Sequence, residues 1–205
     1  YEVLTGDQVC KKDSRMGVPS DAELEKQYER AVSQGADPEF VERTRGGMTG
    51  VIGILHCGEG PIVGMRFDID ALGVFESESM EHRPAREGFA SVNRGFMHAC
   101  GHDTHMASLL GAAQILAEFR DELNGSVKFL FQPAEEINLG AKKMMELNCL
   151  ENPKVDAIFG MHNSPEIPVG TVAVKNGPLM AAVDRIIFTI KGHGGHGGIP
   201  QRNVD

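Results

Sequence analysis

The sequence predicts an α/β fold with a mostly parallel, doubly wound sheet and helices on both faces. Short apolar runs typical of strands alternate with helical patterns between residues 49 and 161. Three of these runs lead directly into polar groups: the acidic segment 68–70, the acidic pair 135–136 and His162. Because ligands of open α/β sheets bind at the carboxyl ends of the strands, we expect one functional site at that edge.

The expected helices have a capping signal or apolar residues at helical spacing. They cover residues 20–32, a short segment from Asp37-Pro38, 103–119 and 140–147. The expected strands are short runs rich in β-branched and aromatic residues. They cover residues 49–56, 61–68, 127–131, 155–161, 170–175 and 185–191. Residues 76–95 are polar and aperiodic, which predicts a long loop.

The composition is that of a globular chain with one sizeable core. The 205 residues are 41% hydrophobic and 24% charged, with a formal net charge of −9. Because no block of Lys and Arg offsets this charge, nucleic acid and anionic membranes are not expected partners. No apolar run approaches the ~20 residues of a membrane span. The four cysteines are scattered without a CxxC pair, which favours free thiols and a cytoplasmic location.

The segment 98–105 concentrates a thiol, a carboxylate and three imidazoles. Each of these side chains alone is more often a structural residue than a ligand. Thiolate and imidazole together, however, are preferred ligands of divalent transition metals. Gly101 lets the backbone turn tightly, so that Cys100 and His102 can reach one metal centre. Asp103 is expected either to cap the following helix or to support a ligand.

Two adjacent carboxylates, Glu135 and Glu136, follow the strand predicted at residues 127–131. Such a pair is often only a solvated helix start, where negative charge is favoured. The functional interpretation is that one carboxylate binds metal while its neighbour acts as a general base on a water molecule.

Three more side chains are candidates for the same site. His162 follows an apolar strand where an exposed imidazole has no packing purpose, so we expect a metal ligand. Asp70 is the candidate for orienting a ligand imidazole. His196 lies among glycines in residues 192–200, which form either a flexible loop or a segment that approaches a substrate oxyanion. The composition does not decide between these two roles.

These motifs together resemble a known family. They are similar, in the same order, to motifs of the amidohydrolase family that contains aminoacylases, hippurate hydrolase and auxin-conjugate hydrolases: residues 67–72, 98–105, 132–136, 160–163 and 192–200. Residues 14–19 and 82–91 also resemble the subgroup that hydrolyses p-aminobenzoyl-glutamate. The resemblance implies hydrolysis of the amide bond of an N-acyl amino acid, with p-aminobenzoyl-glutamate or a related aroyl-amino acid as the expected substrate.

The resemblance also implies two divalent metal ions per active site, either zinc or manganese. Cys100 would bridge the two ions. His102 and His162 would complete the ligands of one ion, and Glu136 would bind the other.

The remaining roles come from the resemblance as well. Glu135 would be the general base for metal-activated water and later the proton donor, and His196 would stabilise the oxyanion. Residues 1–182 would form the N-terminal part of the catalytic domain, and 183–205 the truncated start of a smaller α+β lid or dimerisation domain. The lid implies a homodimer or hetero-oligomer. The last histidine ligand would follow residue 205, so this segment alone is expected to be a poor catalyst.

Two other functions stay open on the sequence. Cys100 could be a nucleophile activated by His102 or His105 in a metal-independent amidase. The chain could also bind metal or a folate fragment without turnover.

Overall fold

The structure is a computed structural model that describes residues 1–184 and 186–202. The chain divides into two compact units, Tyr1–Asn163 and Ser164–Asp205. The domain boundary expected between residues 182 and 183 stays a prediction.

The first unit is built on a five-stranded sheet in the order β1-β2-β4-β3-β5. Its strands are β1 (Glu2–Thr5), β2 (Val51–His56), β3 (Ile62–Asp68), β4 (Ser126–Gln132) and β5 (Ala157–Gly160). β3 pairs in parallel with both β4 and β5, whereas β2 pairs antiparallel with β4 and with β1. Among these strands β2 alone runs in the opposite direction, which confirms the mostly parallel α/β sheet.

Several helices begin where the sequence signals them. Ser20 Oγ accepts a hydrogen bond from Glu23 N at 3.3 Å, and Asp37 caps the next helix in the same way. The helices are α1 (Asp21–Ser33), α2 (Pro38–Arg43), α3 (Arg83–Glu87), α4 (His102–Glu118) and α5 (Gly140–Glu146). Short 3-10 turns are η1 (Gly6–Gln8), η2 (Lys12–Ser14), η3 (Arg120–Glu122) and η4 (Pro200–Arg202).

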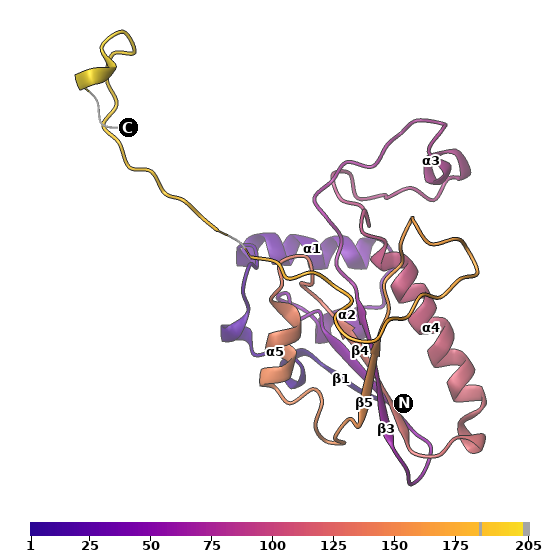
Figure 1. Cartoon of the computed structure of the whole chain (residues 1–205). Helices are drawn as coiled ribbons and strands as arrows, with labels where there is room; N and C mark the ends of the chain where they lie inside the picture. Colours follow the sequence, from indigo (N-terminus) through magenta and orange to yellow (C-terminus); the bar gives the residue numbers. More distant parts are fainter. Residues whose placement is uncertain (185, 203–205) are drawn as a thin grey trace. The chain divides into compact units, whose positions relative to one another are not determined.

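Helices cover both faces of the sheet, with α4 on one face and α5 on the other (Figure 1). Leu109 of α4 joins a buried cluster with Phe129, and Met144 of α5 joins a second cluster with Leu130. Successive residues of a strand point to opposite faces, so Phe129 and Leu130 in β4 supply one apolar side chain to each layer. The two layers hold the carboxyl ends of the parallel strands in place.

Two expectations about local structure are wrong. The segment 76–95 is not a continuous loop, because α3 forms within it, with Pro84 in its first turn and Gly88 ending it at a φ of 78°. Asp103 does not cap α4, since this helix begins one residue earlier than expected and Gly101 is its N-cap. The Asp103 carboxylate instead accepts a hydrogen bond from the backbone N–H of Thr104.

The prediction of strands in the second unit is also wrong for the residues that the structure describes. No strand forms at residues 170–175 or 186–191, and Arg185 lies outside the described residues. Their apolar side chains, such as Val172 and Phe188, are exposed. Alternating apolar residues form a strand only where a neighbouring strand takes their N–H and C=O groups. In residues 164–184 and 186–202, η4 is the one regular helix or strand.

The described helices include none that is both long and apolar enough to cross a membrane.

Candidate metal centre

The three parallel strands bring acidic groups and an imidazole to one edge of the sheet. β3 leads into Asp68 and Asp70, β4 leads into the pair Glu135–Glu136, and β5 leads into His162. Because β3 lies between β4 and β5, the segments that follow these strands are neighbours. The N-terminus of α4 meets the same edge.

His102, the first residue of α4, is fully buried at this edge, with 0% of its surface exposed. Its Nδ1–H donates a hydrogen bond to the backbone carbonyl of Asp70 at 2.9 Å, which leaves a lone pair on Nε2. This Nε2 has no hydrogen-bond partner, but it lies 3.7 Å from a carboxylate oxygen of each of Asp68, Glu135 and Glu136. These distances are too long for hydrogen bonds and suit ligand atoms that share a cation.

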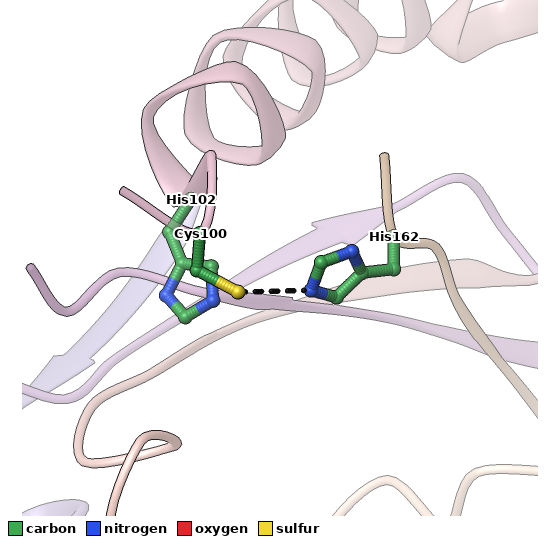
Figure 2. Close-up of side chains that lie close together, drawn as sticks. All are labelled: Cys100, His102 and His162. Carbon is green, nitrogen blue, oxygen red and sulfur yellow. Dashed lines mark hydrogen bonds between the residues drawn. The ribbon is translucent and has the colours of Figure 1, made fainter. Parts of the chain in front are cut away.

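Cys100 and His162 meet beside this imidazole, as Figure 2 shows. Cys100 Sγ lies 3.4 Å from His162 Nε2. His162 Nδ1–H donates to the backbone carbonyl of Asn163 at 2.6 Å, so its Nε2 also carries the lone pair that a metal requires. One ligand atom from each of Cys100, His102 and His162 lies within 4.8 Å of the other two. These three side chains could therefore hold one ion.

The glutamate pair forms a second set with His102, again with ligand atoms within 4.8 Å of one another. Glu136 Oε1 is buried without a hydrogen-bond partner. Asp70 Oδ2 accepts a hydrogen bond from the backbone N–H of Glu136 at 2.9 Å, and Asp70 Oδ1 lies 3.3 Å from His102 Nδ1. Asp70 thus supports two candidate ligands at once, although it is the backbone carbonyl that holds the imidazole most closely.

The electrostatics of the cluster also suit a cation. Burial and the nearby carboxylates of Glu136 and Glu135 raise the pKa of the Cys100 thiol. The chain by itself therefore favours the protonated thiol. A divalent cation among these carboxylates would reverse that preference, because a coordinating thiol loses its proton.

His105 occupies a position that the sequence interpretation missed. It is fully buried, and its Nδ1–H donates to Asp68 Oδ1 at 2.5 Å. Burial alone would raise the pKa of Asp68, but the bond from His105 and the charge of Arg66 outweigh it and lower this pKa. The spacing of three residues between His102 and His105 is the signal that could have found it, since such residues share one helix face.

The two other sequence candidates are Asp103 and His196. Asp103 is exposed on the first turn of α4. His196 belongs to the second unit, where its Nδ1 accepts a hydrogen bond from Gly198 N at 3.1 Å. Its role at an oxyanion stays a prediction.

A sheet that gathers a thiol, imidazoles and a carboxylate pair at the carboxyl ends of parallel strands is typical of α/β metallohydrolases. Comparison with known families agrees with this class. The peptidase family M20/M25/M40 matches residues 64–198, and the chain belongs to this family. The expected family is thereby confirmed.

Three relatives show how far the similarity extends. N-acetylcysteine deacetylase of Bacillus subtilis (strain 168) is 52% identical over 158 residues, which is 77% of this chain and 39% of the relative. The A subunit of p-aminobenzoyl-glutamate hydrolase from Escherichia coli (strain K12) is 41% identical over 182 residues, which is 88% of this chain and 41% of the relative. A crystal structure of a Bacillus subtilis dinuclear metal-binding peptidase of the M20 family has a TM-score of 0.57 and 42% identity, over 78% of this chain and 42% of that chain. The chain spans about two fifths of the length of these relatives.

Proposed function

We propose that this chain forms the metal-binding part of an amidohydrolase that cleaves the amide bond of an N-acyl amino acid. The observation that carries the proposal is the buried, unpartnered Nε2 of His102, which belongs to both sets of potential ligand atoms. Cys100, His102 and His162 would hold one ion. Cys100 and Glu136 would hold a second ion.

The proposed reaction uses these residues as follows. Two divalent ions, zinc or manganese, would polarise the scissile carbonyl and lower the pKa of the attacking water when bound. The Glu135 carboxylate takes a proton from this water as the water oxygen bonds to the carbonyl carbon. Glu135 then gives that proton to the amide nitrogen as the C–N bond breaks, which releases the carboxylic acid and the amino acid. His196 is proposed to stabilise the oxyanion formed between these steps.

The proposed substrate is an aroyl-amino acid such as p-aminobenzoyl-glutamate. Similarity to the p-aminobenzoyl-glutamate hydrolase extends over 182 residues, whereas similarity to the deacetylase extends over 158. The match to an indole-3-acetyl-aspartic acid hydrolase of Enterobacter agglomerans is longer still, over 198 residues. Both longer matches are to relatives named for an aromatic acyl group on an acidic amino acid, and they favour this substrate class although their identities are lower than that of the deacetylase. Assembly into a homodimer or hetero-oligomer through residues 183–205 is part of the same proposal.

The test uses the full-length protein that contains this chain. Release of glutamate from p-aminobenzoyl-glutamate and of acetate from N-acetylcysteine would be measured with the metal content determined in parallel. Glu135→Gln should abolish most of the activity, whereas Glu59→Gln, in an exposed turn between β2 and β3, should not. Full activity after metal removal, or in Glu135→Gln, would refute the proposal.

The metal-independent alternative makes Cys100 the nucleophile. It requires a thiolate, but burial and the Glu136 carboxylate raise the pKa of this thiol. Stoichiometric alkylation of Cys100 in metal-loaded protein, with loss of activity, would favour it. The non-catalytic alternative would be supported if the full-length protein bound p-aminobenzoyl-glutamate without releasing glutamate.

A further inference from the structure

Asn163 connects the two segments that carry the candidate ligands. It follows His162 directly, and its backbone carbonyl accepts the hydrogen bond from His162 Nδ1 at 2.6 Å. Its side-chain amide lies against Gly101, which separates Cys100 from His102. A Cβ atom on Gly101 would be 2.1 Å from Asn163 Nδ2, so the amide occupies the space that any larger residue at position 101 would need.

His105 holds Asn163 in this position. Its Nε2 lies 3.0 Å from the backbone N of Asn163 and 2.9 Å from Oδ1 of the same residue. A neutral ring accepts the hydrogen bond from the backbone N–H, and a protonated ring would donate one to Oδ1. Either bond ties Asn163 to α4. On its other side His105 is bonded to Asp68, which Arg66 Nη1 contacts at 2.9 Å.

A different interpretation would place a metal ion among Asp68, His102 and His105, whose potential ligand atoms also lie within 4.8 Å of one another. Two ligand atoms bound to a tetrahedral ion at ~2.0 Å are about 3.3 Å apart. Asp68 Oδ1 and His105 Nδ1 are only 2.5 Å apart, which is the distance of a short charge-assisted hydrogen bond. A hydrogen atom, not a metal ion, therefore lies between these two atoms, and His105 is not a metal ligand.

We propose that Asn163, held by His105, is a positioning residue that sets the separation of Cys100 and His162 in the metal centre. The inference rests on the proposed metal centre and deepens it. Asn163 acts on one ligand through its own backbone carbonyl and on the other through its packing against Gly101. Without the Asn163 side chain, the segment after β5 and the N-terminus of α4 would move independently. Metal binding would then have to order the ligands, which would lower the metal affinity.

Cobalt binding to the 205-residue chain tests this role. The thiolate-to-cobalt absorption band would be titrated in the wild type and in Cys100→Ser, which identifies the band that depends on Cys100. Asn163→Ala removes the packing against Gly101, and His105→Gln removes the ring that holds the backbone of Asn163. Each is expected to weaken cobalt binding by about 10- to 100-fold.

Two further variants separate positioning from general loss of structure. Asn163→Asp keeps the size of the side chain and should keep nearly the wild-type affinity. Lys128→Met removes a buried polar group of the same unit, whose Nζ donates to backbone carbonyls of residues 149–153. It should lower stability but leave the cobalt affinity of the folded chain unchanged.

The outcomes distinguish the two proposals. Wild-type affinity in both Asn163→Ala and His105→Gln, with a band that requires Cys100, would overturn the positioning role and leave the metal centre intact. A wild-type chain without any Cys100-dependent band would refute the metal centre, and the positioning role with it. Weakened binding in both variants, with recovery in Asn163→Asp, is the expected result.

Discussion

A single methyl group at Gly101 should disrupt the contact between the two ligand-bearing segments. Gly101 has a φ of 83°, a left-handed conformation that costs other L-residues about 1–2 kcal/mol. Its new Cβ would also lie 2.1 Å from Asn163 Nδ2 and 2.8 Å from Asn163 Cγ. The amide must then move and lose its contact with His105, at a net cost of about 0.5–1.5 kcal/mol. We expect Gly101→Ala to lower the free energy of unfolding by about 1.5–3.5 kcal/mol.

Gly111 provides a matched control on the same helix, because a Cβ there would meet no atom within 4 Å. Gly111→Ala should stabilise the chain by about 0.5–1 kcal/mol, as expected for an unstrained position inside a helix. Urea unfolding followed by circular dichroism would compare both variants with the wild type. In an Asn163→Ala background, Gly101→Ala should cost only the conformational part, about 1–2 kcal/mol. An equal cost with and without the Asn163 side chain would show that the two residues do not meet as described.

Three other variants test buried charges and the proposed base. Lys128→Met should lower the free energy of unfolding by about 2–3 kcal/mol, because three backbone carbonyls lose their buried donor. Burial lowers the pKa of Lys128, so the folded chain releases this proton at a lower pH than the unfolded chain does. The stability of the wild type relative to Lys128→Met should therefore rise with pH toward the ordinary lysine pKa. Asp68→Asn should cost about 3 kcal/mol at neutral pH, since it leaves Arg66 and His105 without their carboxylate. The pKa of Asp68 is lowered in the folded chain. The stability difference between the wild type and Asp68→Asn should therefore be complete above the ordinary Asp pKa, and it should disappear as the pH falls below the pKa of Asp68 in the folded chain. Glu135→Gln in the full-length protein should reduce kcat/KM by about 10²–10⁴, with unchanged metal content by elemental analysis.

Local signals in the sequence were sufficient to predict most helices and strands of the first unit. The Ser20 cap, the apolar spacing in α4 and the β-branched runs of β2 and β3 are each decided within a few residues, and the structure confirms them. The prediction of strands in the second unit was wrong because a strand depends on a neighbouring strand from another part of the chain. An alternating pattern at residues 170–175 says nothing about whether that partner is present.

The sequence alone indicates the candidate ligands because their residue types are chemically distinctive. Cys100, His102 and the Glu135–Glu136 pair stand in short motifs directly after strands or before a helix. The spacing of His102 and His105 indicates that the two imidazoles share a helix face, but the partners of His105 could not be found in this way. Its partners Asp68 and Asn163 lie 37 and 58 residues away along the chain, so their contacts exist only after β3, β5 and α4 have packed.

The sequence by itself determined the α/β class, the edge of the sheet that carries the candidate site, and the candidate ligand residues, since periodicity, capping and donor chemistry are local properties. Only the tertiary structure decided the reversed direction of β2, the tautomers of His102 and His162, and the connection of the two ligand-bearing segments through Asn163. These features depend on which backbone carbonyls and side chains come into contact in the packed structure, and the whole fold sets those contacts.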